Sequence, residues 1–155
     1  MPVKKLREFL DEHKVKYVLI SHSPAFTMSE IAATAHICGK KVAKTVMVKM
    51  DGKMAMVILP SDRRIDFEHL EEVTGVTSIE LAPEAEFKKL FPGCEVGAMP
   101  PFGNLYGLDV YVSPELAEQE EIVFNAGTHT ELLQLDFEDF TRLVHPKVPT
   151  ASFGA

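Results

Sequence analysis

Apolar residues near the start of the chain recur with the spacing of a helix and then change to the spacing of a strand. The positions that would share one face of a first helix, ending near His13, are Val3, Leu6, Phe9 and Leu10. The β-branched and aromatic stretch "VKYVLI" (15–20) predicts a strand. Thr27 and Glu30 have the spacing of a capping box, which predicts a helix from 27 to about 36.

The clearest pattern is "KVAKTVMVKMDGKMAMVILP" (41–60), in which two apolar stretches flank Asp51-Gly52. An Asp-Gly pair between two such stretches predicts a β-hairpin with a two-residue type I′ turn. Pro60 should end the second strand, because proline cannot donate a ladder hydrogen bond.

The remaining chain alternates short helices and strands. We expect helices at 66–74, capped by Asp66, at 83–91, with Phe87, Leu90 and Phe91 inward, and at 136–144; we expect strands at 76–81, 105–112, 121–126 and 130–136. This order predicts a mixed α/β (α+β) domain with a largely antiparallel, curved, barrel-like sheet flanked by short helices. Residues 1–145 would form this single domain, and 146–155 a loosely held tail.

Length and composition fit a soluble protein of one domain: 155 residues, 46% hydrophobic and 25% charged. The N-terminus has no apolar signal-peptide region, and no stretch approaches the roughly 18 apolar residues of a membrane span, so we expect a cytoplasmic protein. Cys38 and Cys94 lie far apart without the spacing of metal ligands. We expect two reduced thiols and neither metal nor cofactor.

The net charge of −7 is unevenly distributed along the chain. Residues 1–53 hold ten basic and five acidic side chains, whereas 54–155 hold six basic and eighteen acidic ones. The acidic part argues against a protein that wraps DNA, which requires a broad basic surface. The basic first third can either contact a few phosphates or form an ordinary solvated surface.

Lys44 stands out within the hairpin. Counting by twos places it with Val42, Val46, Val48 and Met50 on one face of a strand, which the valines predict to be inward. Lysine is almost never buried without a partner, so Lys44 either has a function or extends its ammonium to water at the strand end.

The usual nucleophile motifs are absent from the sequence: there is no GxSxG, HExxH or Walker motif. An enzyme of this sequence would therefore use water as the nucleophile, with positioned groups to assist it. His22 follows a predicted strand, and His129 lies just beyond Gly127 among small neighbours. Both histidines are candidates for substrate binding or for polar turn residues.

The stretch "GAMPPFG" (97–103) predicts a stiff loop with conformationally free ends. Preorganised amides suit a carbonyl or a developing oxyanion, and the loop would supply the N–H groups of Gly97, Ala98, Met99, Phe102 and Gly103. The alternative is a rigid connection that crosses the end of the sheet.

Taken together, these residues resemble the YbaK/prolyl-tRNA-synthetase-associated domain family over about Leu6 to Val144. The most specific elements are "VAKTVMVK", the GxxxP loop from Gly97 to Pro101, and "NAGTHTELLQLDFEDF". The resemblance implies hydrolysis of the ester that joins a wrong amino acid to its tRNA. It also implies that Lys44, Gly97 and Pro101 are catalytic, with a ribose hydroxyl of the substrate helping to activate water.

By the same resemblance, His129 would set the size of the amino-acid pocket. Thr45 departs from the asparagine that often follows the lysine in alanine-type members, so alanine, serine, threonine and cysteine all stay open as substrates. The implied partners are the acceptor end of a mischarged tRNA, in particular tRNA for proline, and prolyl-tRNA synthetase.

Two other functions compete with editing. One is a non-catalytic module that binds tRNA or a synthetase, which would not need both Lys44 and the loop. The other is a hydrolase of small activated esters, which the acidic composition favours slightly. The salt dependence of activity separates the latter from tRNA editing.

Overall fold

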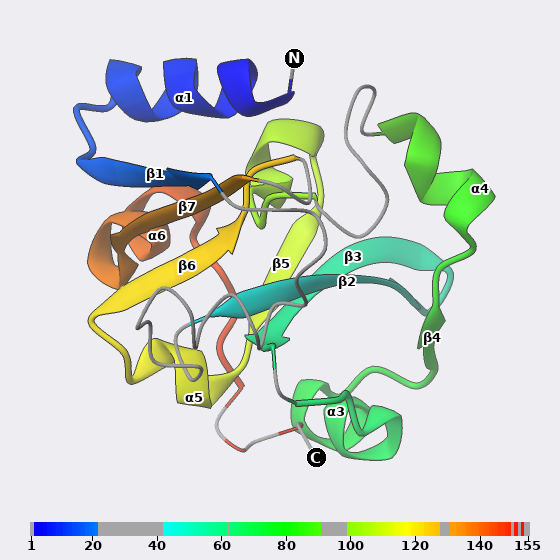
Figure 1. Cartoon of the computed structure of the whole chain (residues 1–155). Helices are drawn as coiled ribbons and strands as arrows, with labels where there is room; N and C mark the ends of the chain where they lie inside the picture. The colour runs from blue at the N-terminus through cyan, green and yellow to red at the C-terminus, as the bar shows by residue number, and fades with distance from the viewer. Residues whose placement is uncertain are drawn as a thin grey trace.

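The computed structural model describes residues 2–21, 42–61, 63–90, 99–127, 131–149, 151 and 153. Short helices and strands alternate along the chain (Figure 1). The helices are α1 (Pro2–Glu12), α3 (Phe67–Thr74), α4 (Glu84–Phe87), α5 (Pro114–Ala117) and α6 (Phe137–Val144). The strands are β1 (Tyr17–Ser21), β2 (Ala43–Met50), β3 (Lys53–Pro60), β4 (Ile79–Leu81), β5 (Asp109–Val112), β6 (Glu121–Asn125) and β7 (Glu131–Asp136).

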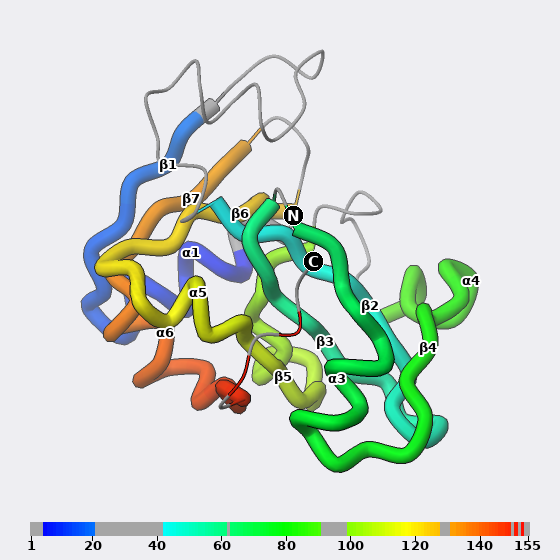
Figure 2. The backbone as a smooth tube through the Cα atoms, turned by 90° about the horizontal axis from the view of Figure 1, so that it is seen from below, coloured from blue at the N-terminus to red at the C-terminus, as the bar shows by residue number. Residues whose placement is uncertain are grey.

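The strands form two sheets, with the orders β1-β7-β6 and β4-β2-β3-β5. The strand pairs are antiparallel except β3 with β5. A parallel bridge between Val42 and Val123 connects the two sheets. The mixed α+β fold with a largely antiparallel sheet is confirmed, but the barrel-like closure is wrong, because these strands divide into two sheets (Figure 2).

The hairpin of β2 and β3 forms as its sequence predicts. Met50 pairs with Lys53, and the turn residues Asp51 and Gly52 have φ of 51° and 85°. Positive φ at both positions is the signature of a type I′ turn. The Asp51 side chain also accepts hydrogen bonds from the backbone N–H of Ser78 at 2.8 Å and of Thr77 at 3.3 Å, so the turn holds the segment before β4.

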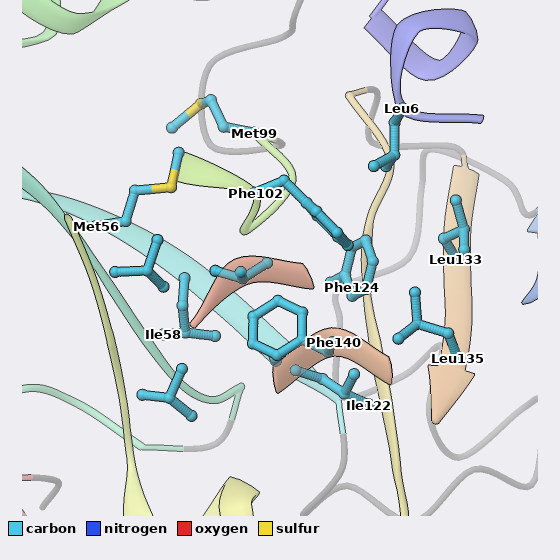
Figure 3. Close-up of a cluster of buried hydrophobic side chains, with 14 of the residues drawn as sticks. Leu6, Met56, Ile58, Met99, Phe102, Ile122, Phe124, Leu133, Leu135 and Phe140 are labelled. Carbon is cyan, nitrogen blue, oxygen red and sulfur yellow. The ribbon is translucent and has the colours of Figure 1, made fainter. Parts of the chain in front are cut away.

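The larger core lies between the two sheets and extends to α1 and α6. It contains Leu6 and Leu10 of α1, and Phe140 of α6 is fully buried in it (Figure 3). On the other face of the β2–β3 hairpin, Val48 and Val57 pack against Leu70 of α3. The hairpin is thus covered on both faces, which explains why both faces of its strands are apolar.

Helix α1 is also tied to β1 by polar contacts. The Tyr17 hydroxyl accepts a hydrogen bond from Arg7 Nε at 3.3 Å and donates one to Asp11 at 3.1 Å. The bond to Tyr17 raises the pKa of Arg7, so this guanidinium stays charged throughout the physiological range. Among the described residues, no helix is long and apolar enough to cross a membrane.

Several local expectations differ from the structure in their bounds or burial. The strand expected at 105–112 begins only at Asp109, because Gly103–Tyr106 forms a 3-10 turn. The strand expected at 76–81 is shortened to Ile79–Leu81. Leu90, expected inward, is 37% exposed, because the helix that begins at Glu84 ends in a short 3-10 turn.

The end of the chain is held more firmly than the sequence predicts. Lys147 exchanges backbone hydrogen bonds with β5, donating to Val110 at 2.8 Å and accepting from Val112 at 2.9 Å. Phe153 is fully buried against the α3 side of the hairpin, and its carbonyl accepts a hydrogen bond from Asp66 N–H at 2.8 Å. The expectation of a loosely held tail is therefore corrected for its described residues, because the pattern at 146–153 is too short to reveal one buried phenylalanine.

Candidate functional site

Lys44 is the second residue of β2 and lies opposite Leu59 of β3. Side chains alternate along a strand. Ala43 and Met47 belong to the core between the sheets, whereas Val46 and Val48 belong to the cluster on the α3 side. Lys44 therefore shares the valine-rich face, which is buried as predicted at Val42, Val48 and Met50. Lys44 itself is half-buried, at the end of that face.

The end of β6 lies beside the start of β2. The side chains of Val42, Val123 and Leu132 form one small buried cluster, with Ile20 against it. The parallel bridge from Val42 to Val123 means that both strands run in the same direction from this cluster. Two residues further along on the same faces come Lys44 on β2 and Asn125 on β6. The topology thus brings a cation and a carboxamide to the same edge.

Asn125 is a buried polar residue whose side-chain oxygen has an unusual environment. It is 7% exposed, and its side-chain Oδ1 has no hydrogen-bond partner among the residues that the structure describes. A buried acceptor without a partner costs about 1–3 kcal/mol of stability. The other buried polar residue in the described part of the chain, Ser113, caps α5 by accepting from Glu115 N–H.

The turn after Asn125 is closed by a hydrogen bond from Ala126 N–H to the Glu131 carbonyl at 3.0 Å. Gly127 has φ of 102°, a conformation that favours glycine. The positive φ that the turn requires is therefore sufficient to explain why residue 127 is a glycine. His129 and His22 lie outside the described residues.

The described half of the 97–103 loop, Met99 to Gly103, is buried. The Phe102 ring packs edge-on against Phe140 with centroids 5.5 Å apart and also contacts Phe124 (Figure 3). The ring of Phe9 in α1 lies against it as well. An aromatic anchor of this kind fixes the position of the loop in the core. Gly97 and Ala98, the first donors expected of the loop, lie outside the described residues.

Gly103 is close to the protein itself. A Cβ at this position would lie 2.7 Å from Cγ2 of Val110 and 2.9 Å from the Leu108 carbonyl oxygen. The absence of a side chain is therefore explained by packing against β5. The sequence alone had suggested that this glycine admits a bound group.

The predicted site residues fall on two faces of β2. Thr45 shares a face with Ala43 and Met47, which belong to the same core as Met99 and Phe102, whereas Lys44 leaves β2 from the opposite face. The register of the Val42–Val123 bridge therefore aligns Lys44 with Asn125, whereas Thr45 is on the face of β2 whose neighbours pack in the same core as the anchored half of the loop. Asn125 was missed by the sequence analysis, although it is the one amide in the apolar run "IVFNA".

Ion pairs elsewhere on the described surface join exposed or half-buried side chains. Lys49, on the opposite face of β2 from Lys44, pairs with Glu86 at 3.1 Å. Among the described residues, no group of three His, Cys, Asp or Glu side chains is placed to hold a metal ion.

One family and several known proteins match the chain. The family described as the aminoacyl-tRNA editing domain matches residues 22–143. The multifunctional Ser/Thr-tRNA deacylase ProXp-y of Escherichia coli (strain K12) is 30% identical over 151 residues, covering 94% of this chain and 89% of that protein. The prolyl-tRNA editing protein ProX of Acetoanaerobium sticklandii is 25% identical, covering 87% of this chain and 85% of that protein.

Two further matches concern larger or more distant proteins. A proline–tRNA ligase of Bacillus mycoides is 32% identical over 90 residues, which cover 58% of this chain and 16% of the ligase. The crystal structure of a candidate trans-editing enzyme for prolyl-tRNA synthetase superposes with a TM-score of 0.81 at 18% identity, covering 97% of this chain and 96% of that one. The latter likeness supports the fold.

Proposed function

The chain belongs to the aminoacyl-tRNA editing domain family, and we propose that it hydrolyses the ester between a small, wrongly attached amino acid and the acceptor end of a tRNA. The observation that carries the proposal is the family match over residues 22–143, which includes Lys44 at the start of a largely buried strand. The named relatives with high coverage include a tRNA deacylase and a prolyl-tRNA editing protein.

Water is the proposed nucleophile, activated with the help of a ribose hydroxyl of the substrate. Lys44 would stabilise negative charge, either on the ester oxygens as it develops or on the terminal phosphate. The α-ammonium of the aminoacyl group must point away from Lys44, because two like charges at contact distance repel. The loop at 97–103, with Pro101 in its buried half, would frame the aminoacyl group through backbone contacts.

We propose tRNA for proline as the carrier and the cytoplasm, where tRNA is charged, as the place of reaction. The match to part of a proline–tRNA ligase supports this carrier. Alanine, serine, threonine and cysteine are the candidate amino acids. Pocket size alone discriminates among them by only about 1–3 kcal/mol per methylene group. His22, Gly127 and His129 are proposed to line this pocket. Thr45, which leaves β2 from the face opposite to Lys44, is proposed to bind the substrate from the side of the 97–103 loop.

The test is deacylation of tRNA for proline that carries alanine, serine, threonine or cysteine, with the wild-type protein, Lys44→Ala and Lys49→Ala. Lys49 is a matched control, because it lies on the same strand but on the opposite face, paired with Glu86. We expect Lys44→Ala to lower kcat/KM about 100-fold or more, as loss of an electrostatic stabiliser does. Lys49→Ala should leave it within about twofold, as exposed ion pairs contribute little.

Two outcomes would contradict the proposal. If no ester is cleaved while an acceptor-stem RNA still binds, the chain is a binding module. If small activated esters are cleaved as fast as the tRNA esters, with no salt dependence, it is a small-molecule hydrolase.

A further inference from the structure

The connection between β3 and α3 carries two adjacent arginines, Arg63 and Arg64. Both side chains are exposed. Within the part of the chain that the structure describes, neither of them forms an ion pair. An exposed cation adds little to the stability of a fold. These two guanidinium groups are therefore available to a partner of opposite charge.

The backbone that carries the arginines, the diarginine loop (residues 61 and 63–66), is fixed at both ends. At its start, Ser61 N–H donates a hydrogen bond to the Val42 carbonyl at 2.8 Å. At its end, Asp66 N–H donates to the carbonyl of the buried Phe153 at 2.8 Å. A loop held in this way presents its side chains with little loss of backbone freedom on binding.

The diarginine loop lies at the same end of the β2–β3 hairpin as Lys44. Pro60, the last residue of β3, pairs with Ala43, the neighbour of Lys44 in the chain. Arg63 N–H donates to the Pro60 carbonyl at 3.0 Å, so the chain turns back directly after this pair. The loop then leads to α3, the helix that covers the valine-rich face of the hairpin (Figure 1). The two arginines therefore lie at the edge of the face to which Lys44 belongs.

The charge of the surrounding chain concentrates any contact with a polyanion at a few cations. Residues 54–155 hold eighteen acidic side chains and only six basic ones, so most of this part repels an anionic partner. Arg142 is already paired with Asp139. Lys147 is likewise paired with Asp109. The four basic side chains that form no ion pair among the described residues are Arg63, Arg64, Lys88 and Lys89.

We propose that Arg63 and Arg64 bind phosphates of the tRNA acceptor end and so hold the aminoacyl ester at Lys44. This inference rests on the proposed editing function and gives it a binding surface. The planar guanidinium group suits the partner, because its five donors match the geometry of phosphate oxygens. A polyanion can approach an acidic domain only where such cations gather, and here they gather beside Lys44.

The decisive comparison uses two esters of the same amino acid, one on tRNA for proline and one on adenosine. The adenosine ester keeps the ribose hydroxyl and the scissile bond but has no phosphate. For the Arg63→Ala/Arg64→Ala double variant we expect KM for the tRNA ester to rise about tenfold with kcat unchanged, as loss of phosphate contacts predicts. The slope of log KM against log salt concentration should fall by about 1.4–1.8, the contribution of two such contacts. Hydrolysis of the adenosine ester should not change.

Two further variants serve as controls. Lys88→Ala/Lys89→Ala removes the same charge from an exposed pair that follows α4, on the far side of the Glu86–Lys49 ion pair, and should leave KM and the slope unchanged. Arg63→Lys/Arg64→Lys keeps both charges and should keep most of the slope, because counterion release depends on charge. A purely structural role of the arginines would not give this pattern.

The outcomes separate this inference from the function on which it rests. If the wild type cleaves neither ester, the proposed function is wrong and this inference fails with it. If the wild type cleaves the tRNA ester and the double alanine variant keeps its KM and slope, only the role of the arginines is overturned. Equal losses on both esters would also overturn it and would mean that the loop supports Lys44. A variant that loses only a stimulation by added prolyl-tRNA synthetase would overturn it in favour of a protein partner.

Discussion

At the scale of single residues, Gly103 shows that the presence of one glycine in a sequence can have two structural explanations. A glycine that flanks a Pro-Pro loop is equally compatible with a close ligand and with close packing. The structure distinguishes the two explanations, because a Cβ at this position would be too close to Val110 and to the Leu108 carbonyl oxygen. Asn125 is the opposite case, because its sequence context is apolar and only the structure shows that its buried Oδ1 has no hydrogen-bond partner among the described residues. Neither property can be read from residue type.

Gly103→Ala should destabilise the fold by about 1–3 kcal/mol, the usual range for overpacking. Because φ at Gly103 is not in the left-handed region, the effect is steric. Val110→Ala, which makes room for the new methyl group, should recover part of the loss in the double variant. The measurement is urea denaturation of the two single variants and the double variant.

The control for this cycle is Gly75→Ala, a change at φ of 74° with no atom within 4 Å of the added Cβ. It should cost about 1–2 kcal/mol through backbone strain alone, and Val110→Ala should give no recovery. Strict additivity of Gly103→Ala and Val110→Ala would contradict the packing explanation.

At the scale of elements, the sequence predicts secondary structure well where one residue type strongly favours one backbone conformation. Asp51-Gly52 gives the type I′ turn, and Asp66 caps α3 by accepting from His69 N–H at 3.1 Å. The stretch at 105–108 was predicted as strand because its apolar pattern fits more than one local conformation. Its 3-10 turn begins with a bond from Leu105 N–H to the carbonyl of Phe102, and the position of Phe102 is set by packing in the core.

Asp51→Ala should lower the free energy of unfolding by about 2 kcal/mol. It removes the acceptor of the Ser78 and Thr77 amides and leaves alanine at a positive φ. Asp51→Asn should cost less than about 1 kcal/mol, because asparagine tolerates this φ and keeps one acceptor oxygen. Urea denaturation measures both values, and faster hydrogen exchange at the Ser78 amide of Asp51→Ala would locate the effect. Equal destabilisation by both variants would contradict a role for the side-chain acceptor.

At the scale of the whole molecule, the closure of the fold depends on contacts between distant segments. The division of the strands into two sheets, linked by the Val42–Val123 bridge, follows from global packing, and no local pattern encodes it. The same holds for Phe153, which packs with Val57 and Leu70 from far earlier in the chain.

Phe153→Ala should therefore destabilise the protein by about 3–5 kcal/mol, the range for a fully buried phenylalanine. Val148→Thr in the same segment, at a side chain that is 42% exposed, should stay within about 0.5 kcal/mol of the wild type. Thermal and chemical denaturation measure the difference. A Phe153→Ala variant as stable as the wild type would restore the interpretation of 146–155 as a loose tail.

Charge is the last property of the whole molecule that bears on function, because a chain of net charge −7 must still receive a polyanion if it edits tRNA. Among the described residues of the basic first third, Lys5, Arg7, Lys14 and Lys16 are exposed and available to do so. Each phosphate contacted there adds roughly 0.7–0.9 to the slope of log KM against log salt concentration.

Lys16→Glu should raise KM for the tRNA ester and reduce that slope, with kcat unchanged, since Lys16 is exposed beside β1. Lys89→Glu makes the same charge change at an exposed site in the acidic part of the chain and should leave both unchanged. Equal effects of the two variants would mean that net charge alone governs tRNA binding, and no effect of either would remove this basic surface from the interface.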